Sequence, residues 1–306
     1  MDILTDFLGQ PLVFVWWNTS LSPLGTPRGT QDDLDIVVRY LKAFREEWGA
    51  DVIGLGEVST SDLIQIMEHL DDPHLTLHDA TGAVNGTRFD IALLYDKRRL
   101  HQTFNRPLIA TYGNHSLKIG ERIDLISSET EVPLTVVVSH WPSRLFAPDF
   151  APKRAEMGMA LRSILDTIRD DFSEPYLVLM GDYNDDPFSP ALADHLLATR
   201  DRELARRSNP LLYNPSWRWI GESLPHGADG TDVGVCGTYY YRSGTPTRWH
   251  TFDQIMFSSA FLRSGTFTLR ESLGRIISTS DLVERLRSAT SIFDHLPVLA
   301  AIDVRV

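Results

Sequence analysis

Apolar, strand-like segments with an acid, an amide or a histidine at one end are the feature that most restricts how this sequence can fold. Six separate segments carry such a residue. The residues concerned are Asn18, Glu57, His140, Asp182 with Asn184, Asp253, and Asp294 with His295. Apolar runs of this length between turn residues are typical of buried strands. If their ends converge, they form a pocket that is rich in oxygen ligands and contains two histidines.

Strands and helices alternate along the chain. Apolar periodicity predicts strands at 11–18, 50–58, 88–96, 122–127, 133–141, 176–180, 252–258 and 297–304, and helices at 32–48, 60–70 and 153–170. The stretch 208–250 is rich in Asn, Pro, Gly, Tyr and Trp, and we expect long surface loops there with one short strand, 237–242. The composition does not change along the 306 residues. The pattern therefore predicts one α/β domain, 1–306, with more than one layer.

Composition restricts the class of protein. Hydrophobic residues make up 42% of the chain without a run of 18, which predicts a globular protein without a membrane span. The first residues carry acids where a signal peptide needs a basic region, and the single cysteine, Cys236, excludes an internal disulfide framework. We therefore expect a cytoplasmic protein. The net charge of −12 opposes non-specific binding to nucleic acid, which depends on lysine and arginine.

The donor types in the expected pocket favour a hard divalent cation. Carboxylate and amide oxygens suit Mg²⁺ or Mn²⁺, whereas zinc would need cysteines or several histidines. Alone, "GDYNDDP" (181–187) is typical of a turn, and an EF-hand would need glycine at Pro187 and glutamate at Ala193. "GLGEVS" (54–59) matches a dinucleotide-binding fingerprint only in part. The sequence has no GxSxG motif and no Walker lysine motif, so a serine hydrolase or a P-loop NTPase lacks its signature.

Each segment alone has an ordinary structural explanation, but their joint occurrence in this order resembles the endonuclease/exonuclease/phosphatase superfamily. The matching segments are "WWNTS" (16–20), "IGLGEV" (53–58), "RFDIALLYD" (88–96), "VVVSHWPSR" (136–144), "LMGDYNDDP" (179–187), "TFDQIMFS" (251–258) and "FDHLPV" (293–298). This superfamily of metal-dependent phosphoesterases includes deoxyribonucleases, inositol polyphosphate 5-phosphatases and neutral sphingomyelinases. The resemblance implies a four-layer α/β sandwich, in which two mainly antiparallel or mixed sheets pack face to face with helices outside.

The resemblance also implies roles for the metal and water sites. Glu57 corresponds to the principal metal ligand, with Asn18 and Asp294 beside the ion. Asp182 corresponds to the acid that orients or deprotonates the attacking water. Asn184 corresponds to the amide that binds a phosphate oxygen.

The histidines are assigned in the same way. Asp253 and His295 resemble the carboxylate–histidine pair of the superfamily, and we expect a hydrogen bond between them. His140 resembles the histidine that contacts the phosphate, and Asp90 is a looser match that would orient it. The superfamily pattern leads us to expect an acid at Ser59, so this loop departs from it.

The implied reaction is hydrolysis of a phosphoester with one or two Mg²⁺ or Mn²⁺ ions, by in-line attack of water and without a covalent intermediate. We expect a nuclease whose substrate is DNA or RNA. Four arginines near the motif segments are the expected substrate contacts: Arg144, Arg154, Arg242 and Arg248. Screening limits surface charges to about 8 Å at physiological salt, so local arginines can outweigh distant acids. Aromatic residues in 213–219 and 237–249 can stack on bases.

Two alternatives stay open at this point. One is a small-molecule or lipid phosphoesterase, which an acidic protein would suit. The other is a catalytically inert binding protein with the same fold. The sequence does not distinguish DNA from RNA or endonuclease from exonuclease action, and it does not give the number of metals or the oligomeric state.

Overall fold

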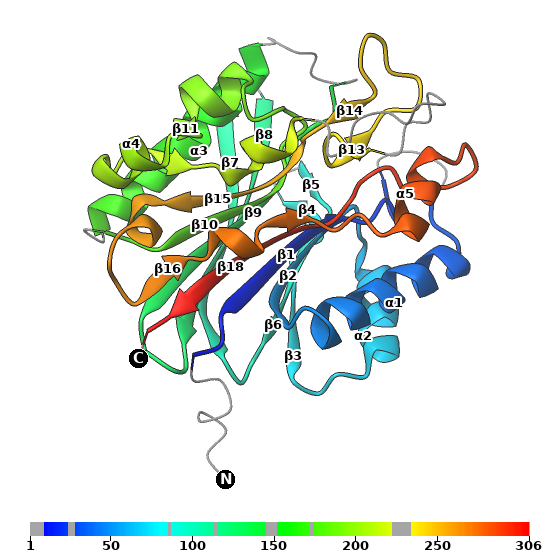
Figure 1. The fold of residues 1–306 in the computed structure, drawn as a ribbon, viewed down its shortest axis with the longest axis horizontal. Coiled ribbons are helices and arrows are strands. Elements are labelled where there is room, and N and C mark those ends of the chain that lie inside the picture. Colours follow the sequence, from blue (N-terminus) through cyan, green and yellow to red (C-terminus); the bar gives the residue numbers. More distant parts are fainter. Residues whose placement is uncertain are drawn as a thin grey trace.

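Two seven-stranded β-sheets pack face to face, and helices cover the outer face of each sheet (Figure 1). The computed structural model describes residues 9–23, 28–84, 87–112, 115–144, 152–171, 174–221 and 234–305. The four layers of helix, sheet, sheet and helix confirm the fold expected from the sequence.

The first sheet has the strand order β16-β18-β1-β2-β6-β3, with β17 paired to β18. Its strands are β1 (Leu12–Asn18), β2 (Ala50–Gly56), β3 (Leu75–Asp79), β6 (Ile91–Asp96), β16 (Phe267–Leu269), β17 (Arg275–Ile276) and β18 (Val298–Val304). Among the described strand pairs of this sheet, β1 and β2 are parallel and the others are antiparallel. Helices α1 (Gln31–Glu46) and α2 (Thr60–Leu70) cover its outer face, together with the short α5 (Ser280–Arg287).

The second sheet has the order β11-β12-β15-β10-β9-β8-β7. Its strands are β7 (Leu100–Tyr112), β8 (His115–Ser127), β9 (Pro133–His140), β10 (Leu177–Asp182), β11 (Ala198–Thr199), β12 (Leu212–Tyr213) and β15 (Asp253–Ser258). Strands β9 and β10 run parallel, and β15 pairs antiparallel with β10. Helix α3 (Pro152–Asp171) packs on the outer face through Met157, Leu161 and Leu165.

The central core lies between the two sheets and follows from the two-residue period of the strands. Phe14 and Trp16 of β1 point into this core, whereas Val15 and Trp17 point outward to the helices. In the second sheet, the inward residues include Val138 of β9. Strands that are buried on both faces have nearly continuous apolar sequences, so these segments could be predicted as strands.

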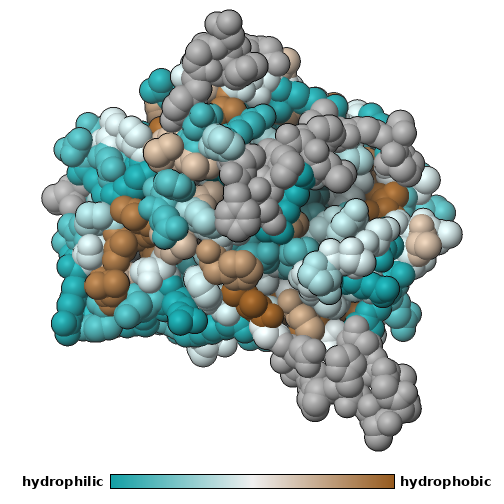
Figure 2. Space-filling view, turned by 90° about the horizontal axis from the view of Figure 1, so that it is seen from above, coloured by the Kyte–Doolittle hydropathy of each residue, from teal (hydrophilic) through white to brown (hydrophobic). Residues whose placement is uncertain are grey.

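The remaining elements are short. Strands β4 (Gly82–Val84) and β5 (Thr87–Phe89) form one small hairpin, and β13 (Tyr239–Tyr240) and β14 (Trp249–His250) form another. The other helices are α4 (Arg202–Arg207), η2 (Ala191–His195), η3 (Pro215–Trp219), η4 (Ser259–Leu262) and η5 (Glu271–Leu273). In the view from above, hydrophobic residues form separate patches on a largely hydrophilic surface (Figure 2). Among the described residues, no helix is both long enough and apolar enough to cross a membrane.

Three sequence expectations need correction. The strand predicted at 50–58 ends at Gly56, because the next residue, Glu57, has a φ of +52° that a strand does not accept. The strand predicted at 88–96 is interrupted at Asp90 and forms β5 and β6. The β7–β8 hairpin extends well beyond the predicted 122–127. Its first strand was not predicted, because residues 100–112 alternate poorly and lie largely at the surface.

Candidate active site

Three neighbouring strands of the second sheet place His140, Asp182 and Asp253 in one row. Asp182 of β10 pairs with His140 of β9 on one side and with Asp253 of β15 on the other. All three side chains point to the inner face, because each continues the inward alternation of its own strand. The row lies where the apolar part of β10 ends, so the sheet itself brings these groups together.

The first sheet contributes Asn18, at the end of β1, and Glu57, just beyond β2. The side-chain amide of Asn18 donates to Glu57 Oε1 at 3.3 Å and to Asp182 Oδ2 at 3.1 Å. Trp16 donates its indole N–H to Asp253 Oδ1 at 2.8 Å. Two of these hydrogen bonds cross from one sheet to the other, so they fix the two halves of the site relative to each other.

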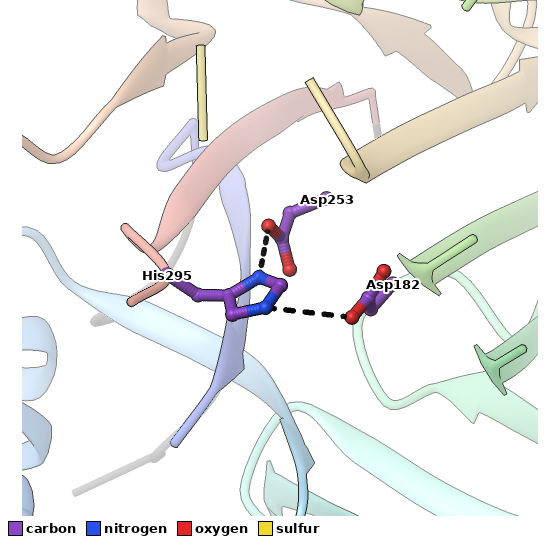
Figure 3. Close-up of side chains that lie close together, drawn as sticks. All are labelled: Asp182, Asp253 and His295. Carbon is purple, nitrogen blue, oxygen red and sulfur yellow. Dashed lines mark hydrogen bonds and ion pairs between the residues drawn. The ribbon is translucent and has the colours of Figure 1, made fainter. Parts of the chain in front are cut away.

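His295 is held against Asp253, as Figure 3 shows. Its Nδ1 donates to Asp253 Oδ2 at 2.7 Å, which is the hydrogen bond expected from the sequence. Its Nε2 lies 3.7 Å from Asp182 Oδ2 and 3.9 Å from Asp294 Oδ1. Burial opposes a charged ring, but Asp253, Asp182 and Asp294 together raise the pKa of His295 well above its ordinary value. The ring therefore presents a charged N–H donor beside Asp182.

His140 forms a second pair of the same kind with Asp90. Its Nδ1 donates to Asp90 Oδ2 at 3.0 Å, and its Nε2 lies 3.8 Å from both Glu57 Oε1 and Asp182 Oδ2. Burial again opposes the charged ring, but Asp90 raises the pKa of His140. Lys118 donates to the other oxygen of Asp90. Burial alone would raise the pKa of Asp90, but the charges of His140 and Lys118 lower it below its ordinary value. Asp182 thus lies between two imidazoles that are each oriented by a buried aspartate.

The loop after β10 shapes the other side of Asp182. Asn184 has a left-handed φ of +50°, and its backbone N–H donates to Asp182 Oδ1 at 2.7 Å. The Asn184 side-chain amide donates to the Trp141 carbonyl at 3.0 Å. These two hydrogen bonds hold the loop in a conformation that costs a non-glycine residue roughly 1 kcal/mol or more. Burial, followed by the charge of Asp253, raises the pKa of Asp182.

The donor set of Glu57, Asn18 and Asp294 fits a hard divalent cation. Glu57 and Asp294 have the carboxylate oxygens that Mg²⁺ and Mn²⁺ prefer, and Asn18 has an amide oxygen, which accepts from the Ser20 N–H at 3.2 Å in this structure. Burial raises the pKa of Glu57 to about 7, and Asp294 and Asp90 add to the effect although His140 opposes it. A carboxylate whose charge is disfavoured in this way is stabilised by a bound cation. Ser20 donates to Asp294 Oδ1 at 2.9 Å and orients it.

A second group of possible ligands consists of Asp182, Asp253 and His295, whose ligand atoms lie within 4.8 Å of one another. Both oxygens of Asp253 are already engaged, one by Trp16 and one by His295. His295 uses Nδ1 in the same interaction. The geometry therefore favours an aspartate–histidine pair acting beside Asp182 over a metal centre in this group.

Two of the four expected substrate arginines lie beside the loop that contains Asn184, Arg144 just after β9 and Arg154 in the first turn of α3. Arg144 donates to the Asn184 carbonyl and lies 3.1 Å from Asp186 Oδ2. Arg154 is only 3% exposed, and it bonds to Asp185 Oδ2 and to the Pro142 carbonyl. Contact with a substrate stays a prediction for both residues, but the burial of Arg154 argues against it. Asp185 and Asp186 thus hold arginines in addition to shaping the loop.

The other two arginines lie farther along the chain. Arg242 donates to the carbonyls of Leu286 and Phe293, and so ties the β13 region to the segment before β18. Arg248 donates to the Tyr240 hydroxyl at 3.2 Å. Both have structural contacts, and their contact with a substrate also stays a prediction.

Several residues of the site were not predicted from the sequence. Trp16 has no assigned role in the sequence analysis, yet its indole N–H donates to Asp253 and orients it. Lys118 lies on β8, in the part of the hairpin that the sequence did not indicate. Ser59, where an acid was expected, caps α2 by accepting from the Asp62 N–H. Tyr239 lies with its ring centroid 4.6 Å from that of His295.

We expect that Arg154→Ala destabilises the protein by about 3–5 kcal/mol, because it removes the nearer of the two arginines beside the buried Asp185 carboxylate, and the other, Arg144, lies at 3.7 Å. Urea denaturation measures the change. The double variant Arg154→Ala/Asp185→Ala is expected to recover part of the loss. If Arg154→Ala is as stable as the wild type but binds substrate more weakly, Arg154 contacts the substrate and is not needed to stabilise Asp185.

Comparison with known proteins places this geometry in a family. The sequence profile of the Endonuclease/Exonuclease/phosphatase family matches residues 25–286, which is most of the chain. The chain belongs to this family. It therefore belongs to a family of phosphoesterases, and the hydrogen-bonded pocket described above is its candidate active site. No curated protein matches the sequence.

Solved structures of the Endonuclease/Exonuclease/phosphatase family have the same fold. The catalytic domain of human Nocturnin has a TM-score of 0.60 and 16% identity, over 96% of this chain and 95% of that domain. D. rerio TDP2, complexed with a single-strand DNA product, has a TM-score of 0.57 and 16% identity, over 96% and 99% of the two chains. A mannosyl-6-phosphatase of Bacteroides thetaiotaomicron has a TM-score of 0.58 and 12% identity, over 95% and 99%.

Proposed function

We propose that the protein is a divalent-metal-dependent phosphodiesterase that hydrolyses DNA or RNA by in-line attack of water. The observation that carries the proposal is the arrangement around Asp182. Two aspartate–histidine pairs direct their Nε2 atoms to within 3.7 and 3.8 Å of Asp182 Oδ2, and the side-chain amide of Asn18 donates both to this oxygen and to the Glu57 carboxylate. Phosphoryl transfer depends on positioning and on stabilising charge, which this arrangement supplies.

Each group has a defined task in this proposal. Asp182 accepts a hydrogen bond from the attacking water and takes its proton, since its Oδ2 faces the pocket. His295 and His140 donate from Nε2 to the non-bridging phosphate oxygens, which carry more charge in the transition state than in the ground state. A cation held by Glu57, Asn18 and Asp294 supplies polarisation of the phosphoryl group and stabilises the leaving oxygen.

Nucleic acid is the proposed substrate class because aromatic side chains line the approach to the site. Tyr239, Tyr241 and Phe252 lie along the cavity next to Asn184, and aromatic rings bind unpaired bases by stacking. D. rerio TDP2, which has the same fold, is complexed with a single-strand DNA product, and this supports the proposed substrate class. The net charge of −12 implies few phosphate contacts and weak, salt-sensitive binding.

A small phosphorylated sugar is the second candidate substrate. The observation that favours it is the pairing of Arg144 and Arg154 with Asp186 and Asp185, which leaves little net positive charge beside the site. The mannosyl-6-phosphatase of Bacteroides thetaiotaomicron shows that the same fold can serve such chemistry.

A single assay distinguishes the two candidates. Purified protein is incubated with plasmid, single-stranded DNA, RNA and mannose 6-phosphate, each with EDTA, Mg²⁺ or Mn²⁺ and at two salt concentrations. We expect cleavage of nucleic acid that requires a divalent cation and falls with added salt. Asp182→Asn protein, prepared identically, excludes a contaminating nuclease. Turnover of the sugar phosphate without cleavage of any nucleic acid would refute the nuclease proposal and support the second candidate.

A further inference from the structure

A cavity of about 940 Å³ opens beside the candidate active site. Cavities of roughly 300–1,000 Å³ are typical of sites that bury a drug-sized ligand. Asn184 and Tyr239 belong both to its lining and to the surroundings of Asp182 and His295. The cavity therefore adjoins the pocket in which the proposed function places the reacting phosphate.

The lining carries aromatic rings with nearly parallel planes. The rings of Tyr239 and Phe252 are stacked at 5.0 Å, and those of His250 and Phe252 at 4.7 Å. Tyr241 lies 6.4 Å from Tyr239 with an angle of 14° between the planes, and it is 42% exposed. Tyr239 lies on β13, Tyr241 follows directly after this strand, and the ring geometry places the two side chains on the same side of the chain. The exposed ring of Tyr241 extends the aromatic surface away from His295.

The charges around the cavity are close to balanced. Arg144 lies 3.1 Å from Asp186 and 3.7 Å from Asp185, and Arg154 lies 3.0 Å from Asp185. His250 donates from Nδ1 to Asp186 at 3.0 Å. Asp185 and Asp186 neutralise the two arginines, so the cavity offers little net positive charge to a further phosphate group. A flat, uncharged ring faces aromatic surfaces and the remaining ring nitrogen of His250, so it suits the cavity better.

We propose that this cavity takes an unpaired nucleobase next to the scissile phosphate, with Tyr241 as its stacking surface, and that the protein therefore cleaves single strands in preference to duplexes. The inference rests on the proposed function, because it assumes a nucleic-acid substrate. A base in a duplex must leave its stack and its partner before it can enter a cavity, which costs a few kcal/mol. An unpaired base enters without that cost, and every base has a face that can stack.

The test measures kcat/KM on three oligomers of equal length with Mg²⁺ present. They are a single strand, the same strand in a duplex, and a backbone that carries no bases. Wild-type protein is expected to prefer the single strand over both of the others. Tyr241→Ala is expected to lower kcat/KM on the single strand by about 5- to 150-fold, the range for loss of one base-stacking contact, and much less on the base-free backbone. Tyr241→Phe keeps the ring and is expected to keep the preference.

Phe104→Ala is the matched control, because Phe104 is another exposed aromatic residue, 44% exposed, on β7 and outside the cavity lining. Phe104→Ala is expected to have the same kcat/KM as the wild type on all three oligomers. If Tyr241→Ala does not fold, inhibition of the wild type by deoxyadenosine 5′-monophosphate is compared with inhibition by ribose 5-phosphate, and the nucleotide is expected to bind more tightly.

Two outcomes overturn the inference while the proposed function stands. One is equal wild-type rates on single and double strands, and the other is an equal loss on the base-bearing and base-free strands in Tyr241→Ala. Absence of cleavage on all three oligomers would instead refute the proposed function itself.

Discussion

Replacing Asp182 by asparagine is expected to lower kcat by about 10²- to 10⁴-fold, the usual contribution of a positioned general base. Asparagine keeps the size of the side chain and an oxygen that can accept from the Asn184 N–H. It cannot take a proton from the attacking water, and it removes a negative charge 3.7 Å from His295. Because the loss lies in the chemical step, KM is expected to change little. Steady-state kinetics on the substrate identified by the assay above measures both parameters.

Asp124→Asn provides the control for this variant. Asp124 lies on β8 of the same sheet, where it bonds to Arg122 and Thr135, away from the pocket. It is expected to keep kcat close to that of the wild type. If Asp182→Asn keeps full activity while remaining folded, Asp182 is not the base, and the assignment of the water site fails.

Replacing Glu57 by glutamine is expected to raise the Mg²⁺ concentration needed for half-maximal activity by more than about 100-fold. Even residues that only orient a metal ligand contribute roughly 10- to 100-fold to affinity, and Glu57 is assigned here as a direct ligand. Calorimetric titration with Mg²⁺ or Mn²⁺ measures binding independently of turnover. Unchanged affinity in Glu57→Gln would place the cation elsewhere, with the group of Asp182, Asp253 and His295 as the next candidate.

Glu57→Gln weakens metal binding, but in the absence of metal we expect it to raise the stability of the folded protein. Burial raises the folded-state pKa of Glu57 from 4.5 to about 7, so the folded protein holds a proton that the unfolded chain has lost between these pH values. Wild-type stability is therefore lost as pH rises through this window, by on the order of 3 kcal/mol in total. Glutamine does not titrate. In EDTA, we expect Glu57→Gln to be more stable than the wild type at pH 8, and the difference to shrink towards pH 5 in urea denaturation.

The strands that build the site could be predicted because they are buried on both faces. The apolar run before Asp182 and the similar run before His140 are long enough to identify β10 and β9. The polar residue at each end then marks the edge where the strands converge. Asp253 and His295 were predicted as partners from a resemblance, and the two side chains lie in hydrogen-bond contact.

What the sequence did not reveal depends on tertiary packing. Nothing in the residues around Glu57 indicates its left-handed backbone, since glutamate has no local preference for it. Lys118 lies on β8, outside the predicted strand 122–127, and only the packing of the second sheet against the first brings it to Asp90. Tyr239 lies in a segment with many aromatic residues. Only the tertiary structure, which pairs Tyr239 with His295, determines which of them packs against this histidine.

The hydrogen bonds that cross between the sheets have a consequence for how the protein acquires activity. The groups that meet at Asp182 come from positions as distant as Asn18 and His295, and β18, which follows His295, pairs with β1. A growing chain on the ribosome has no complete site until β18 has emerged and joined β1. A phosphodiesterase built in this way stays inert while the part of its chain that precedes β18 is being made.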